Sequence, residues 1–197
     1  MLVSTKNARE LLQVMKWLAT YDNVKFAGFE AHPLYCSEAA SKLQISTHKV
    51  DVVNAALVGP EHGTTIQLNL NGSDGVGDNL IRGSGSQKMS VKACRLSEYL
   101  LKEDIEPDKD VILLRMNFEG AELFVLQDLI SSGLIGKIDG FYGRWVDPKK
   151  IGNATAVEFA KLVNQHKIQH LPFNNKDLGS MLRVFAIKYD LNTSLIA

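Results

Sequence analysis

The chain has 197 residues, of which 45% are hydrophobic and 22% charged, so it can bury a substantial core and is not a disordered polymer. Its 22 lysine and arginine residues equal its 22 aspartate and glutamate residues, which excludes a net field favouring nucleic acid or an anionic membrane. The N-terminal residues lack the apolar stretch of a signal peptide, and nowhere do ~18 apolar residues run together. Cys36 and Cys94 are too few for a disulfide framework, and neither belongs to a cluster with metal-ligand spacing. We therefore expect a cytoplasmic, metal-free protein of one domain over residues 1–197, with reduced, buried thiols.

The first third of the chain predicts a helix, a strand, a second helix and a second strand. Asn7 and Glu10 have capping-box spacing, which predicts a helix over roughly 7–21. The apolar residues 24–29 predict a strand that ends at Glu30, and Pro33 suits the first turn of a helix at roughly 34–44. The β-branched run 50–58, closed by Gly59-Pro60, predicts the next strand. This order is that of a βαβ unit.

The middle third is richer in glycine. Residues 64–70 alternate like a half-exposed strand, 89–94 predict a short strand and 96–102 a short helix. Between them, five glycines interrupt a polar stretch from Gly72 to Gly85. We expect this stretch to be the most mobile internal segment, either as a lid over a site or as a plain surface loop.

The last third predicts two more strands with helices and a terminal hairpin. The run 111–114 reads as a buried strand, and the apolar face that begins at Ala121 predicts a helix that Gly133 stops. A strand over 138–146 and a helix with a capping box at Thr155 and Glu158 follow. Strands at 168–173 and 182–189 are close enough to pair antiparallel. The expected fold is α/β, a mostly parallel sheet flanked by helices with an antiparallel C-terminal hairpin.

Polar residues stand at the ends of these predicted strands. Asn117, Glu119 and Glu122 follow the strand 111–114, with Gly120 permitting a sharp turn into the helix. Chemistry in open α/β sheets sits at such ends, although Asn117 and Glu119 could equally cap the helix. Glu30 is either a site residue or a solvated strand-end carboxylate. We expect Glu30, Asn54, Asn117 and Glu119 to converge on one cleft.

Three motifs in the same order resemble the FkbM-type family of S-adenosylmethionine-dependent methyltransferases. Phe29-Glu30-Ala31-His32-Pro33 is similar to the family's F-E-P-x-P, and Val53-Asn54-Ala55-Ala56-Leu57 matches its next strand. Leu114-Arg115-Met116-Asn117-Phe118-Glu119-Gly120-Ala121-Glu122 resembles its L-K-I-D-V-E-G-A-E. The resemblance covers about residues 24–146 and implies the Rossmann-like class I methyltransferase fold, whose last strand is antiparallel.

The resemblance also implies a cofactor site and a reaction. The expected cofactor is S-adenosylmethionine, with Glu30 accepting hydrogen bonds from the ribose hydroxyls beside Ala31 and His32. Asn54 and Ala55 would border the adenine, and Asn117 would hold the cofactor's amino end. Glu119 would position or deprotonate an acceptor, a small molecule or glycan that is methylated on oxygen.

Two departures from the family pattern define a second hypothesis. Asn117 stands where the family has an aspartate, which keeps hydrogen bonding but removes a charge. No glycine precedes Gly28, so the Gly-rich turn after the family's first strand is missing. Either the sequence begins inside a longer protein, or the chain is a non-catalytic methyltransferase-like binding domain.

Two further positions have open interpretations. His32 could stack beside the adenosine or lie in an exposed loop. Tyr142, Arg144 and Trp145 end a predicted strand and could line an acceptor pocket, although a core position for Trp145 and a solvent position for Arg144 are equally compatible with the pattern.

Overall fold

The computed structural model describes residues 24–44, 49–70, 78–80, 87–103, 105–106, 109–118, 120–143 and 152–172. The helix expected at 7–21, the strand expected at 182–189 and most of the Gly-rich stretch lie outside these ranges. In chain order the elements are β1 (Lys25–Phe29), α2 (Pro33–Leu43), β2 (Lys49–Val53), β3 (Ala56–Leu57), β4 (Thr65–Leu70), β5 (Gln87–Cys94), α3 (Leu96–Lys102), β6 (Leu113–Arg115), α4 (Glu122–Ser131), η2 (Ile135–Lys137), β7 (Gly140–Gly143), α5 (Asn153–Gln165) and β8 (His170–Pro172).

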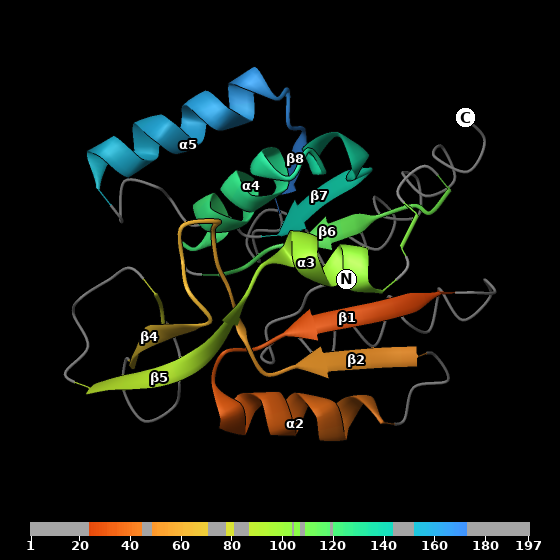
Figure 1. Ribbon diagram of the computed structural model, residues 1–197, viewed down its shortest axis with the longest axis vertical. Helices are drawn as coiled ribbons and strands as arrows, with labels where there is room; N and C mark the ends of the chain where they lie inside the picture. The colour runs from red at the N-terminus through yellow and green to blue at the C-terminus, as the bar shows by residue number, and fades with distance from the viewer. Residues whose placement is uncertain are drawn as a thin grey trace.

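The strands form three small sheets rather than one continuous sheet within the described ranges. β1 and β2 are parallel, β6, β7 and β8 are parallel in that order, and β5 lies between β3 and β4. β3 is parallel to β5, while β4 and β5 are antiparallel. The mixed α/β class and the predominance of parallel pairs are therefore confirmed. Figure 1 shows the arrowheads of β1, β2, β6 and β7 pointing to the same side of the molecule.

The single strand predicted over 50–58 is two strands in two different sheets. β2 pairs with β1, and β3 pairs with β5. The chain bends between them at Asn54 and Ala55, where the Ala55 N–H donates to the Val53 carbonyl over 3.0 Å. The prediction of one strand was wrong because an unbroken apolar run signals burial, not which partner strand each half of the run will pair with.

The helix ends follow the sequence signals in one case and depart from them in another. Gly133 has φ +74° and ends α4, with its N–H bonded to Ile130 and the N–H of Leu134 bonded to Leu129, as in a Schellman motif. The capping box predicted at Thr155 was wrong, because α5 already begins at Asn153 and its N-cap is Gly152. Thr155 and Glu158 are therefore inside the helix, and Glu158 instead accepts a bond from Gln127 of α4 over 2.8 Å.

One side-chain core joins elements from separate sheets. The cluster contains residues of β1, β3, α3, β6, α4 and β7, and its fully buried centre is formed by Met116, Val125, Leu126 and Leu129. Phe29 of β1 and Leu114 of β6 are both in it, although no ladder joins these two strands in the described residues. A smaller cluster fills the space around β3, β4 and β5. The core therefore fixes the strand ends of both parallel sheets relative to each other.

At the last described strand, the pairing is parallel. β8 lies beside β7, with Tyr142 opposite Leu171. A strand near 168–173 is thus confirmed, while its expected antiparallel partner at 182–189 lies outside the described residues.

Candidate functional site

Glu30 and Asn54 end the two strands of the first sheet and are linked to each other. The Glu30 N–H donates to the Val53 carbonyl over 3.1 Å, which extends the β1–β2 ladder by one bond. Asn54 Nδ2 donates to the carbonyls of Glu30 and Ala31 over 2.9 and 3.1 Å. The amide of Asn54 therefore fixes the backbone at the exit of β1. This positions the Glu30 side chain.

The Glu30 carboxylate is partly buried. Its Oε1 accepts the His32 N–H over 3.0 Å. Burial raises the pKa of Glu30 above the ordinary value for a glutamate, the hydrogen bond from His32 opposes that shift, and the charge of Asp78 adds to it. The charged form of Glu30 is therefore less stable here than a fully solvated carboxylate. An additional hydrogen-bond donor would stabilise it.

We expect Glu30→Gln to stabilise the protein at neutral pH. A raised pKa means that the folded state binds the Glu30 proton more tightly than the unfolded chain, so wild-type stability falls as pH rises and the carboxyl ionises. Glutamine keeps the acceptor for His32 without the charge. In urea unfolding, the variant should have a higher free energy of unfolding than wild type at pH 7, and this difference should shrink toward pH ~4. An advantage that does not change with pH would contradict a buried-charge origin.

His32 and Ala55 have structural surroundings that the sequence did not indicate. His32 is the N-cap of α2, and its Nδ1 accepts the Leu34 N–H over 3.3 Å while its ring lies 4.5 Å from that of Tyr35. His32 therefore caps α2 at the exit of β1, and its stacking beside an adenosine stays a prediction. Ala55 is buried at 4% exposure. Only a small part of its surface faces outward.

Asn117 follows β6 and carries a buried acceptor. Within the described part of the chain, no donor reaches its Oδ1. Gly120 turns the chain at φ +108°, as predicted, and the two oxygens of Glu122 accept the N–H groups of Phe118 and Gly120, each over 2.8 Å. Glu122 is 2% exposed, so it closes this turn instead of facing a crevice. The carboxylate in the first helical turn was the available signal for this role.

The predicted site residues are only partly brought together. Glu30, Ala31, His32 and Asn54 form one hydrogen-bonded group at the ends of β1 and β2. Asn117 follows the parallel strand β6 of another sheet, whose arrow points to the same side in Figure 1. Glu119 lies outside the described residues, as do Arg144 and Trp145. Tyr142 is 2% exposed and packs over Gly140, so it belongs to the core and not to an open pocket.

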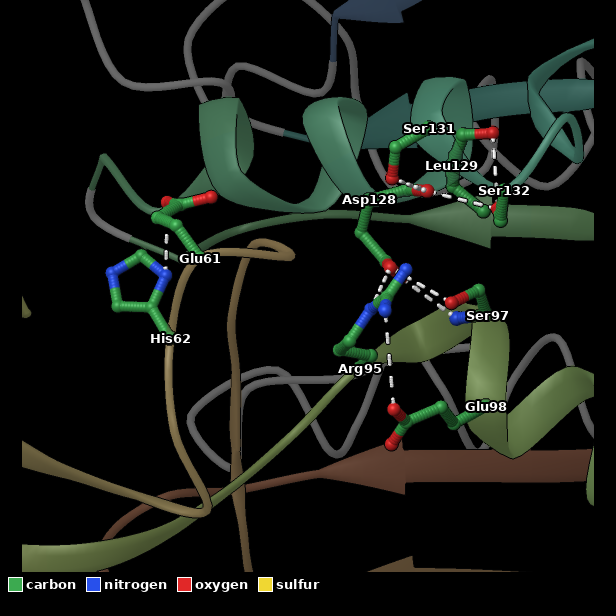
Figure 2. A network of polar contacts seen from close by, with 9 residues as sticks. All are labelled: Glu61, His62, Arg95, Ser97, Glu98, Asp128, Leu129, Ser131 and Ser132. Atoms are coloured by element: carbon green, nitrogen blue, oxygen red, sulfur yellow. Dashed lines mark hydrogen bonds and ion pairs between the residues drawn. The ribbon is translucent and has the colours of Figure 1, made fainter.

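A histidine and a glutamate near α4 were missed by sequence reasoning. The turn Gly59–His62, closed by a 3.2 Å bond from the His62 N–H to the Gly59 carbonyl, follows β3. It places His62 Nδ1 2.9 Å from Glu61 Oε1 (Figure 2). The His62 ring lies 4.5 Å from that of Phe124. Gly59-Pro60 was a signal for the turn. Nothing in the spacing pointed to the α4 contact.

The second network in Figure 2 is structural. Asp128 of α4 is fully buried and accepts bonds from Arg95 Nε at 2.6 Å, Ser97 N at 2.8 Å and Ser97 Oγ at 2.7 Å. It thereby caps the first turn of α3, whose N-cap Arg95 makes no side-chain capping bond of its own. This network joins α3 to α4.

The described residues do not support a reactive cysteine, a metal site or a membrane-spanning helix. Burial raises the pKa of Cys94 to about 11 and also raises the pKa of the buried Cys36, so neither thiol has the low pKa of a reactive cysteine. In the described ranges, no three His, Cys, Asp or Glu side chains are grouped so that they could hold a metal ion. None of the helices described here has the length and apolar character needed to cross a membrane.

Comparisons of the chain with protein-family models, with curated proteins and with solved structures found no match.

Proposed function

We propose that the chain is an S-adenosylmethionine-dependent methyltransferase that acts on an oxygen of a small-molecule or sugar-containing acceptor. The observation that carries this proposal is the buried Oδ1 of Asn117, which no donor reaches within the described residues. It follows the strand β6, on the side of the sheet where ligands of α/β folds bind. A buried acceptor of this kind is stabilised by a donor from a ligand.

The groups at the strand ends suit the hydrogen-bond donors of this cofactor. Glu30 has a carboxylate with one oxygen bonded to a backbone N–H and further acceptor capacity, which fits two ribose hydroxyls. Asn117 Oδ1 fits the ammonium group of the methionine part. Asn54 acts indirectly, because its Nδ2 already holds the backbone of Glu30 and Ala31.

In the proposed reaction, the protein binds and orients the reactants. The cofactor, when bound, supplies a methyl group that an acceptor oxygen takes as the carbon–sulfur bond breaks and its electron pair returns to sulfur. Glu30 and Asn117 hold the two ends of the cofactor, so that much of the rate comes from alignment. Glu119 remains the residue proposed from the sequence to position or deprotonate the acceptor.

Glu30→Ala should weaken the binding of S-adenosylhomocysteine by about 1.5–3 kcal/mol, the usual loss for hydrogen bonds to a charged group. The measurement is calorimetric titration of wild type and variant. The matched control is Glu38→Ala on α2, where a carboxylate with 47% side-chain exposure pairs with Lys42. Equal affinity in wild type and Glu30→Ala would remove Glu30 from the site.

The alternative is a non-catalytic methyltransferase-like binding or interaction domain. The observation that favours it is the division of the parallel strands into β1–β2 and β6–β7–β8 within the described residues. A wild-type chain that shows no heat with millimolar S-adenosylhomocysteine and no competition with S-adenosylmethionine would support this alternative and overturn the methyltransferase proposal.

A further inference from the structure

We propose that His62, held by Glu61 and Phe124, is the group that accepts the proton of the acceptor hydroxyl; this inference rests on the proposed methyltransferase function. The carbon–oxygen bond to the methyl group forms, the oxygen–hydrogen bond breaks, and the proton moves to Nε2 of His62. The positive charge that leaves sulfur thus reappears on the imidazole, so charge and atoms balance.

The environment of His62 selects one ring nitrogen for this role. Nδ1 is buried and lies 2.9 Å from Glu61 Oε1, without the geometry of a hydrogen bond. The side chain nevertheless has 21% exposure, which belongs to atoms other than Nδ1. Nε2 is the remaining ring nitrogen that can take a proton.

The position of His62 is fixed from two directions. On one side, the Glu61 carboxylate folds back over Gly59, where an added Cβ would lie 2.8 Å from both carboxylate oxygens. On the other, the His62 ring meets Phe124 at an interplanar angle of 62°. Phe124 is in the first turn of α4, directly after the segment that carries Asn117. His62 is thus fixed beside the first turn of α4, which follows the segment that carries Asn117.

The segment that carries His62 also lies on the expected side of the fold. It follows the carboxyl end of β3, since the Val58 N–H donates to the Cys94 carbonyl where the β3–β5 ladder ends. Figure 1 shows the connection from β3 to β4 running along the side to which β1 and β6 point, next to α4. The segment after β3 and the segment after β6 thus lie on the same side of the fold.

The first test locates His62 without requiring turnover. Diethyl pyrocarbonate acylates accessible imidazole nitrogens, and peptide mass spectrometry reports each histidine separately. We expect saturating S-adenosylhomocysteine to abolish acylation of His62 in the intact wild-type chain. The exposed His166 at the end of α5 is the internal reference and should react equally with and without the ligand. Binding measured by calorimetry without protection of His62 would overturn the inference and leave the proposed function standing.

The second test concerns the proton. With ribose, glucose and glycerol as hydroxyl probes, release of S-adenosylhomocysteine should fall by ~10²–10⁴-fold in His62→Gln, the usual contribution of a general base. His62→Phe keeps the ring against Phe124 and should show the same loss, which separates chemistry from packing. Gly59→Ala pushes the Glu61 carboxylate away and should give a smaller loss.

The outcomes separate the two proposals. No binding of S-adenosylhomocysteine to wild type overturns both. A wild-type rate in His62→Phe, with a large loss in Glu119→Gln, overturns the role of His62 and assigns the proton to Glu119. If none of the three probes is methylated, the first test alone decides: protection of His62 by S-adenosylhomocysteine supports the inference, and its absence overturns it.

Discussion

Replacing Asp128 by alanine should lower the free energy of unfolding by about 3 kcal/mol. Losing one partner of a buried ion pair removes about 3–5 kcal/mol, because the other charged or polar groups lose their partner. Here the lower end applies, since the Arg95 side chain keeps 28% exposure and can be rehydrated. The N–H of Ser97 also loses its capping acceptor, which weakens α3. Urea unfolding followed by circular dichroism measures the change.

The control for Asp128 is the neighbouring Glu98. Its side chain is 66% exposed and lies 4.0 Å from the same arginine, so Glu98→Gln should change stability by no more than about 0.5 kcal/mol. Equal effects of the two substitutions would mean that the buried network adds nothing beyond surface charge.

Gly143→Ala should have a comparably large effect through the backbone. Gly143 has φ +115°, and a Cβ built there would lie 1.9 Å from the carbonyl oxygen of Met116. The conformation costs an L-residue about 1–3 kcal/mol. The collision adds about 1–3 kcal/mol, because the backbone of β6 would have to move. The two costs together predict a loss of about 2–6 kcal/mol in the free energy of unfolding, measured by thermal or urea unfolding.

Gly136→Ala is the matched substitution for Gly143. Gly136 is in η2, and a Cβ there would meet nothing within 4 Å. The free energy of unfolding of the Gly136→Ala variant should stay close to that of wild type. If Gly143→Ala proved equally harmless, the close approach of β7 to Met116 would not exist in solution.

Local signals predicted the elements well, because they act over a few residues. Pro33 at the start of α2, Gly133 at the end of α4 and the alternation of β4 each act within one turn or strand. The division between β2 and β3 was not predictable in this way. Both halves of that run are apolar, and only the partners β1 and β5, distant in sequence, determine where it bends.

In the candidate site, too, the sequence predicted local features but not contacts that depend on the fold. The sequence placed Glu30 and Asn117 at strand ends, because a polar residue after an apolar run marks that point. It did not predict that the Glu122 carboxylate would accept hydrogen bonds from the backbone of Phe118 and Gly120. Nor did it predict that the Asn54 amide would donate to the backbone at the end of β1. These roles depend on side-chain direction after a turn. The contact of His62 with Phe124 joins residues that no local pattern relates.

The division of the sheet has a consequence for cooperativity. Within the described residues, β1 and β2 form a two-stranded parallel pair, which cannot persist in water by its backbone bonds alone. What holds it to β6 and β7 is the shared side-chain core, with Phe29, Leu114 and Leu126 in one cluster. The three small sheets are therefore not separate folding units: each is stable only while the others are formed, and loss of the common core should unfold them together in one transition.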